Sequence, residues 1–333
     1  MFTLIPYGSE VTTPLVIAHR GASGYRPEHS RSAYLLAIEL GADAIEPDIV
    51  SSSDGVLVLR HENEISGTTD VASRPEFADR RTTKHIDGQK LTGWFTEDFT
   101  WQELSTLFAV ERLPTIRAAS SAFGGQEAIL RLTDLLDILD QADRPVGLVA
   151  ELKHASYFES IGHPLVELFA AEIRAAGWGN DSRLTIECFE KTALLKLRDR
   201  GIGGRLVFLL ESSGAPADDP GRRSADYLSD EGLAALAEEV DGISLDKHLL
   251  LAKDAAGLRV GTALVARAHA AGLMVFCWTL RPENQFLAKS LRSGANAASY
   301  GNWREEFRML MRMGLDGVFA DQPDLAIEVR ASL

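Results

Sequence analysis

The chain has 333 residues, of which 45% are apolar and 25% are charged, as in an ordinary soluble globular protein. Its 48 acidic and 34 basic side chains give a formal net charge of −14. Because so acidic a chain is a poor partner for nucleic acid or an anionic bilayer, we expect neither nucleic-acid binding nor stable membrane insertion. No apolar run reaches the roughly 18 residues that a membrane span needs.

The first residues, MFTLIPYGSEVTTP, lack a basic stretch followed by an apolar one, so we expect no signal peptide. The chain as given is therefore expected to be cytoplasmic, or periplasmic or extracellular if a leader has been removed. Its two cysteines, Cys188 and Cys277, lie in apolar strand-like runs. We expect buried free thiols rather than a disulfide. The sequence carries no signal for an oligomeric state.

Short β-branched runs alternate with helical stretches along most of the chain. PLVIAHRG precedes the helix SRSAYLLAIELG, for which Ser30 is an expected N-cap, and the runs ADAIEPDIV and GVLVLRH follow. After residue 145, strands and helices alternate regularly, the strands being PVGLVAELK, RLTIECF, GRLVFLL, GISLDKHLL, LMVFCWTL and LDGVFAD. Such alternation is typical of parallel βαβ units.

These runs give nine strand candidates, whereas a closed (β/α)₈ barrel needs eight. Only SSSDG separates the second candidate from the third, which is too short for a crossover helix. One candidate therefore lies outside the barrel, and the pattern does not say which. Residues 62–130 are polar, with aromatic turns, and we interpret them as an insertion subdomain after the third strand, over the barrel mouth. The prediction is a single α/β TIM-barrel domain spanning 1–333.

Polar residues stand at the ends of the predicted strands, where packing alone would not favour them. The first strand ends in His19 and Arg20, and the third ends in His61. The second contains Glu46 and Asp48 at i, i+2 spacing, which directs both side chains to the same face. In a parallel barrel all strand C-termini open on one rim, so we expect these groups to meet there.

The fourth strand adds Glu151 and Lys153 at the same spacing. Three carboxylates on one rim would repel one another unless a cation joined them, and oxygen ligands select Mg²⁺ or Ca²⁺ over zinc. Two histidines titrating near neutral pH and a lysine complete the set. A site of this kind suits phosphoryl chemistry on a small diester.

Each residue taken alone has a simpler interpretation. A Glu-x-Asp pair at a strand end is more often a solvated edge, and a histidine in an apolar run is by default a hydrogen-bonded core residue. Lys153 alone would be a surface lysine or a partner for Glu151. The occurrence of all these residues at successive strand ends favours a common site over packing.

The motifs AHRGASGYRPEHS, IEPDIV with DGVLVLRHE, AELK and DGVFADQPD together resemble glycerophosphodiester phosphodiesterases, over most of residues 15–325. The PEHS and TTDVA elements are most similar to the bacterial periplasmic-type branch. The resemblance implies a TIM-barrel enzyme that hydrolyses deacylated phospholipids, such as glycerophosphocholine or glycerophosphoethanolamine, to sn-glycerol 3-phosphate and an alcohol. It also implies one divalent metal ion, Ca²⁺ or Mg²⁺, as cofactor.

By motif match, the resemblance assigns the metal-ligand positions to Glu46, Asp48 and Glu151. It assigns the acid/base pair to His19 and His61.

The same resemblance assigns roles to four further residues. Arg20 and Lys153 would neutralise the phosphate, and Glu28 would be a polar support within the loop. Trp278 would line the glycerol side of the pocket, although a core aromatic is an equally good interpretation of that residue.

The chain departs from the family pattern at three places. His29 and Ser30 stand where many members have Asn-Thr, which should not affect the chemistry. Glu62 follows His61 where most members have Asp, so an extra methylene could shift that carboxylate. Gly67 lies in a stretch where the family often carries an Arg before the threonines, so phosphate or substrate contacts are expected to differ.

Two alternative functions are weighed against hydrolysis of glycerophosphodiesters. A related phospholipase-like barrel would cleave lyso-phospholipids, but the polar residues 62–130 favour a water-soluble small-molecule substrate. A degenerate barrel would bind a phospho-ligand without turnover. The presence of both histidines and all three carboxylates argues against the second alternative.

Overall fold

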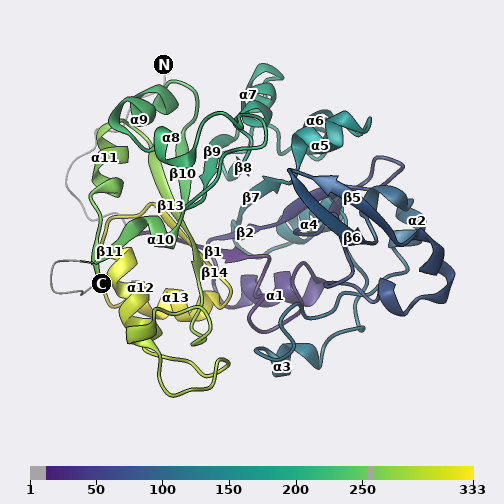
Figure 1. The fold of residues 1–333 in the computed structure, drawn as a ribbon, viewed down its shortest axis with the longest axis horizontal. Helices are drawn as coiled ribbons and strands as arrows, with labels where there is room; N and C mark the ends of the chain where they lie inside the picture. Colours follow the sequence, from purple (N-terminus) through teal and green to yellow (C-terminus); the bar gives the residue numbers. More distant parts are fainter. Residues whose placement is uncertain (1–12, 254–258) are drawn as a thin grey trace.

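The structure, a computed structural model, describes residues 13–253 and 259–333. The start of the chain, on which the expectation of no signal peptide depends, lies outside the described residues. The main sheet is parallel except at one edge, and its strands occupy the middle of the molecule (Figure 1). Its strands are β1 (Leu15–His19), β2 (Ala44–Glu46), β3 (Asp48–Ser51), β4 (Leu57–Leu59), β7 (Gly147–Leu152), β8 (Leu184–Cys188), β9 (Arg205–Leu210), β10 (Gly242–Asp246), β13 (Met274–Leu280) and β14 (Gly317–Ala320).

This sheet closes into the predicted TIM barrel. β2 pairs in parallel with β1 on one side and with β7 on the other, and β3 continues beside β7 after Pro47. Ten strands form the sheet; with β2 and β3 counted as one interrupted strand and antiparallel β4 left out, eight parallel strands remain. The candidate that lies outside the barrel is therefore GVLVLRH, which folds back on β3 as a hairpin.

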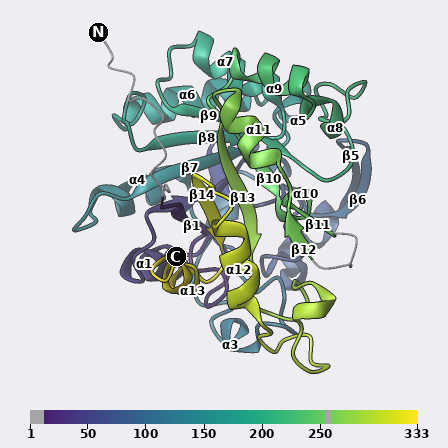
Figure 2. The same cartoon turned by 90° about the vertical axis from the view of Figure 1, so that its left-hand side faces the viewer.

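Helices follow the barrel strands and surround them (Figure 2). Ser30 caps the first helix as expected, because its side chain accepts a hydrogen bond from the Ala33 backbone N–H. The run KHLL, predicted as part of a strand, is instead the short helix α10. The helices that connect or follow barrel strands are α1 (Arg31–Glu39), α4 (Leu132–Asp140), α5 (Ala155–Ser160), α6 (Leu165–Ala175), α7 (Lys191–Asp199), α8 (Ser224–Tyr227), α9 (Asp230–Ala237), α10 (Lys247–Leu250), α11 (Leu264–Ala270), α12 (Trp303–Met311) and α13 (Pro323–Arg330).

The segment between β4 and α4 carries its own small elements, to one side of the barrel in Figure 1. Because β4 is the outer strand of a hairpin, the segment lies between the second and third barrel strands; that residues 62–130 form a separate subdomain stays a prediction. Its elements are the hairpin β5 (Thr82–Ile86) and β6 (Gln89–Gly93), the helices α2 (Trp101–Leu104) and α3 (Ala118–Ser121), and three 3₁₀ turns. A second short hairpin, β11 (Leu251–Lys253) with β12 (Arg259–Gly261), follows α10.

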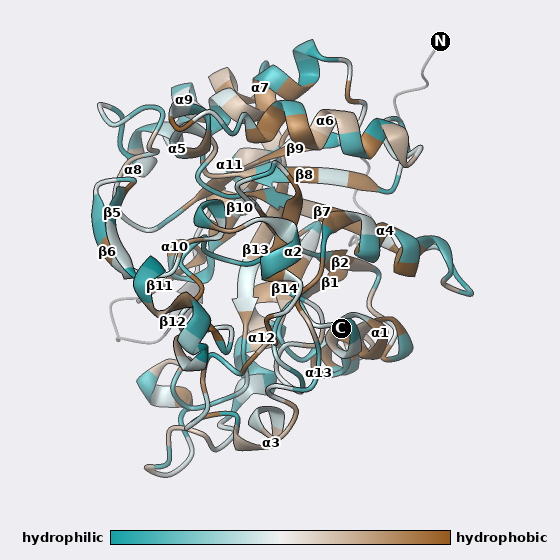
Figure 3. Ribbon diagram, turned by 90° about the vertical axis from the view of Figure 1, so that its right-hand side faces the viewer, coloured by the Kyte–Doolittle hydropathy of each residue, from teal (hydrophilic) through white to brown (hydrophobic). Residues whose placement is uncertain are grey.

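The interior of the barrel is a small apolar layer that lies directly below the polar strand ends. Its members come from six strands and are Ile17, Ala44, Val149, Val207, Phe276 and Phe319. Because alternate strand residues face the same side, the residue two positions after each inward-facing one also points inward, but at the C-terminal rim. Figure 3 shows the central strands largely in brown, whereas loops and outer helices carry more teal.

No helix among the described residues is long and apolar enough to cross a membrane. Cys188 and Cys277 are free and buried, as expected.

Candidate active site

Strand register brings the predicted site residues together. His19 on β1 lies beside Glu46 on β2, and Asp48 on β3 lies beside Glu151 on β7. Glu151 in turn lies beside Glu187 on β8. Neighbouring parallel strands thus place one histidine and four carboxylates in a continuous row at the rim.

Glu46, Asp48 and Glu151 form a buried carboxylate triad. One oxygen atom from each lies within 4.8 Å of the others. Glu46 Oε1 and Asp48 Oδ1 are buried and accept no hydrogen bond. Because buried carboxylate oxygens are costly without a partner, and hard divalent cations take oxygen ligands, the triad fits a divalent metal ion.

Two positive side chains lie against this triad. Arg20 places Nε 3.1 Å from Asp48 Oδ2 and Nη1 3.2 Å from Glu28 Oε2, and its backbone N–H donates to Glu46 Oε2 at 2.7 Å. Lys153 Nζ lies 2.6 Å from Glu151 Oε1 and 3.5 Å from Asp48 Oδ1. Both cations are buried, so their charges are weakly screened by solvent.

Burial, mutual repulsion and neighbouring cations shift the pKa values of the three triad carboxyl groups in different directions. Burial, together with Asp48, raises the pKa of Glu46 well above its ordinary value. Burial likewise raises the pKa of Glu151 to about 8, although Lys153 opposes the change. The pKa of Asp48 is also pushed up by burial, but Lys153, His61 and Arg20 outweigh it and hold this pKa well below its ordinary range. A bound cation would favour the ionised form of all three.

His19 is held by a carboxylate that the sequence reasoning missed. Its Nδ1 lies 2.6 Å from Asp321 Oδ1, just after β14. This contact makes Nδ1–H the donor and leaves Nε2 as an acceptor. Burial and Arg20 lower the pKa of His19 to about 4, against the opposing effect of Asp321.

His61 has a similar carboxylate partner. Its Nδ1 lies 2.5 Å from Glu62 Oε1. Burial, Arg20 and Lys153 lower the pKa of His61 to about 3, although Asp48 and Glu62 oppose them. The expectation that both histidines titrate near neutral pH is therefore wrong for the metal-free protein, because burial and two neighbouring cations disfavour the imidazolium.

The turn after β1 requires a glycine. Arg20 and Gly21 both have left-handed backbone, with φ of 61° and 82°. A Cβ on Gly21 would lie 2.8 Å from the backbone carbon of Ala33 in α1. The turn therefore packs directly on the first helix, and this contact fixes the direction in which His19 and Arg20 leave the strand.

Arg112, from the segment between β4 and α4, joins two loops of the site. It donates to both oxygens of Glu28 and to both oxygens of Glu62, at 2.7–2.8 Å. Burial raises the pKa of each carboxylate, but Arg112 with Arg20 outweighs it at Glu28, and His61 with Arg112 outweighs it at Glu62, so both values lie below the ordinary range. Arg112 thus brings a guanidinium into this region. The chain itself has Gly67 in the stretch where the resemblance implies an arginine.

Replacement of Arg112 by Met is expected to lower the free energy of unfolding by about 2 kcal/mol at pH 7, because two carboxylates lose their shared partner. Both carboxylates have lowered pKa values, so the stabilisation is present above their unfolded pKa of about 4.3 and is lost as the pH falls. Urea unfolding measured from pH 7 to pH 3.5 should show that the difference in free energy of unfolding between wild type and Arg112→Met becomes smaller in acid. A difference that does not change with pH would contradict this account.

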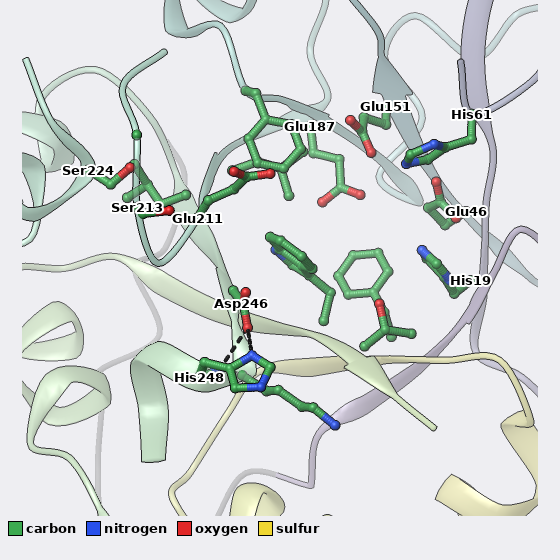
Figure 4. Close-up of a pocket in the computed structure, with 18 of the residues that line it drawn as sticks. His19, Glu46, His61, Glu151, Glu187, Glu211, Ser213, Ser224, Asp246 and His248 are labelled. Atoms are coloured by element: carbon green, nitrogen blue, oxygen red, sulfur yellow. Dashed lines mark hydrogen bonds and ion pairs between the residues drawn. The ribbon is translucent and has the colours of Figure 1, made fainter. Parts of the chain in front are cut away.

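A cavity of about 900 Å³ opens at this rim (Figure 4). His19, Glu46, His61 and Glu151 point into one side of it, and Glu187 and Glu211 into another. Its lining also includes Arg20, Lys153 and Trp278. The structure therefore gathers the predicted residues around one space, with Asp48 buried beneath and Glu28 in the supporting loop.

The residues that sequence reasoning missed are Asp321, Arg112 and Glu187. Asp321 lies two residues after the inward-facing Phe319, so the strand alternation could have identified it. Glu187 lies two residues after Thr185 on β8 and could have been found in the same way. Arg112 sits in an irregular segment without periodicity, and no local signal marks it.

Comparison with known proteins agrees with this geometry. The model of the glycerophosphoryl diester phosphodiesterase family matches residues 19–325. The glycerophosphodiester phosphodiesterase GDPD6 of Arabidopsis thaliana is 33% identical over 325 residues, covering 94% of this chain and 84% of the relative. The chain belongs to this family. It is accordingly an enzyme of the phosphoric diester hydrolase class.

Solved structures share the fold. A phosphodiesterase from Oleispira antarctica, in complex with the product sn-glycerol 3-phosphate, aligns with a TM-score of 0.62 at 21% identity, covering 95% of this chain and 96% of that one. A glycerophosphodiester phosphodiesterase from Agrobacterium tumefaciens aligns with a TM-score of 0.58 at 18% identity, covering 95% and 99%. At these identities the likeness establishes the TIM-barrel fold of this family member.

Proposed function

We propose that the protein hydrolyses glycerophosphodiesters to sn-glycerol 3-phosphate and an alcohol, with a divalent metal and a histidine pair. One observation carries the proposal: a buried carboxylate triad lies at the C-terminal rim of the barrel, beside a cavity that is lined by two of its members, two cations and two neutral imidazoles. The family membership supports the reaction class, and the product bound to the Oleispira antarctica relative supports the glycerol 3-phosphate half of the substrate.

Glu46, Asp48 and Glu151 would hold the metal ion, Mg²⁺ or Ca²⁺. When bound, such an ion neutralises charge on a non-bridging phosphate oxygen and lowers the pKa of a nearby hydroxyl. Arg20 and Lys153 add positive charge for the phosphate without a proton to lose at neutral pH. Their carboxylate partners hold both side chains in place before the substrate arrives.

The two histidines would move the protons. With Nδ1 committed to a carboxylate, each imidazole presents Nε2 to the substrate. One neutral imidazole accepts the proton of the attacking water or hydroxyl. The other, protonated when the anionic diester is bound, donates a proton to the departing alkoxide. Asp321 and Glu62 would stabilise the imidazolium formed at each position.

The proposal is tested by identifying the products released from glycerophosphocholine in the presence of Mg²⁺ or Ca²⁺. Phosphorus NMR should show sn-glycerol 3-phosphate as the phosphorus-containing product, with choline in equal amount. Phosphocholine and glycerol would indicate cleavage of the other ester bond and would overturn the proposal. A lyso-phosphatidylcholine control should turn over at least tenfold more slowly, whereas faster turnover would favour the lipid-cleaving alternative.

A further inference from the structure

The cavity extends beyond the groups that would act on the phosphate. At about 900 Å³ it lies near the upper end of the range of roughly 300–1,000 Å³ for small-molecule sites. The wall away from His19 and His61 includes Glu187, Glu211 and Asp246 (Figure 4). These residues lie at or just after the ends of β8, β9 and β10, and the end of β13 adds Trp278. A phosphodiester joins two alcohols, and this wall can contact the one that departs when the diester is cleaved.

Glu187, at the end of β8, is a buried carboxylate without a partner. It is 2% exposed, and among the described residues none forms a hydrogen bond or ion pair with it. It lies outside the metal triad, whose members are Glu46, Asp48 and Glu151. Lys153, whose charge acts on Glu187, is held by Glu151. Because an unpaired buried carboxylate is costly, its position on the cavity wall calls for a positively charged or hydrogen-bonding ligand group.

Two aromatic rings form a corner on the same wall. Phe189 and Trp278 are half-buried, their ring centroids are 5.9 Å apart, and their planes meet at 83°. Aromatic faces attract cations, quaternary ammonium groups in particular. Lys153 Nζ already lies 5.6 Å from the Phe189 centroid, so this ring accepts a positive charge in the folded protein.

The other charged side chains on this wall are of both signs, and Asp246 already accepts a hydrogen bond from the His248 backbone N–H. Glu211 and Asp246, at the ends of β9 and β10, line the cavity. Lys247 Nζ lies 2.6 Å from Glu306 Oε1, and this ion pair neutralises the lysine charge, so that it does not repel a ligand cation. Two further cations on the cavity lining are exposed to solvent, Lys289 and Arg292.

We infer that the leaving alcohol carries an ammonium group and that Glu187, Phe189 and Trp278 bind it. The inference rests on the proposed function and adds the chemical class of the head group: amino alcohols, with quaternary or primary ammonium, in preference to neutral polyols. Trp278 is thereby placed on the leaving-group side rather than on the glycerol side that the sequence resemblance implies.

The test compares glycerophosphocholine with glycerophosphoglycerol, whose head group is neutral. The ratio of the two kcat/KM values is measured for wild type, Glu187→Gln and Phe189→Leu, with Glu238→Gln, an exposed carboxylate at the end of α9, as matched control. Wild type should favour glycerophosphocholine. Glu187→Gln should lower the ratio about tenfold, Phe189→Leu about threefold, and the control should leave it unchanged.

A second measurement does not depend on turnover of either diester. Choline should inhibit wild type competitively, and Glu187→Gln should raise its inhibition constant about tenfold, whereas inhibition by glycerol should shift by less than twofold. A wild-type ratio near one, or equal losses on both diesters in Glu187→Gln, would overturn the inference. Absence of turnover on both diesters would instead count against the proposed function, so the two failures are distinguishable.

Discussion

Treatment with EDTA is expected to abolish hydrolysis of glycerophosphocholine, by more than 10³-fold, and Mg²⁺ or Ca²⁺ should restore it. The reason lies in the triad: Glu46 and Asp48 each have a buried carboxylate oxygen that accepts no hydrogen bond, and the triad lies beside the cavity in which the phosphate would bind. Asp48→Asn should lose a similar factor that added metal does not restore. Turnover that survives exhaustive EDTA treatment would eliminate the carboxylate site as a metal centre.

Metal binding should also be visible without substrate. In the metal-free protein burial raises the pKa of Glu151 to about 8 and that of Glu46 well above its ordinary value. At that pKa most Glu151 carboxyl groups are protonated at pH 7 and must lose their proton when a cation binds, and the raised pKa of Glu46 acts in the same direction. Calorimetric titration with Ca²⁺ in buffers of different ionisation enthalpy should show proton release. The midpoint of thermal unfolding should rise with Ca²⁺ concentration, because the ion binds the folded state. Neither effect should occur in Asp48→Asn.

Replacement of His19 by Ala is expected to lower kcat by about 10²–10⁴-fold, the usual contribution of a positioned acid or base. His61→Ala should lose a similar factor. Because burial and Arg20 lower the pKa of His19 to about 4, its neutral form persists through the whole neutral range. With His19 as the base, the acid limb of the kcat/KM profile of the wild-type enzyme should therefore lie near pH 4. Unchanged turnover in His19→Ala would remove its acid/base role.

Asp321→Asn separates positioning from chemistry at His19. Asp321 raises the pKa of His19 and fixes its Nδ1 as the donor, so the variant should lower kcat by about 10²-fold. It should also move the acid limb of the pH profile to lower pH, because the remaining influences on His19 all lower its pKa. Glu328→Gln, an exposed carboxylate on α13, is the control and should alter neither kcat nor the profile. A loss of kcat without movement of the acid limb would indicate a general structural effect.

Much of the fold could be predicted because strand periodicity is a local property. The barrel strands begin and end close to the predicted runs, and the i, i+2 spacing of Glu46 with Asp48 brings both into the triad. The identity of the extra strand could not be predicted, because the run GVLVLRH has the same composition as a barrel strand. What excludes this run from the barrel is its antiparallel pairing with β3 through the short SSSDG turn.

The site was predictable to the extent that it depends on strand ends. Each motif residue could be placed on the rim from sequence, whereas the partners of those residues could not. Arg112 meets Glu28 and Glu62 from 84 and 50 residues away. The ordinary pKa of a histidine was likewise a poor guide, because burial and two cations at His61 outweigh its carboxylate partner.

Arg117 extends the connection that Arg112 makes. It lies five residues along the same segment and bonds to Asp321, to Glu283 and to the backbone carbonyl of Ser23. The two arginines thus anchor loops that follow β1, β4, β13 and β14, although neither belongs to the barrel. Proteolytic cleavage within residues 110–117 is therefore expected to loosen Glu62 and Asp321, the carboxylates that orient the two imidazoles, without cutting a barrel strand. Inactivation of the enzyme would then precede its unfolding.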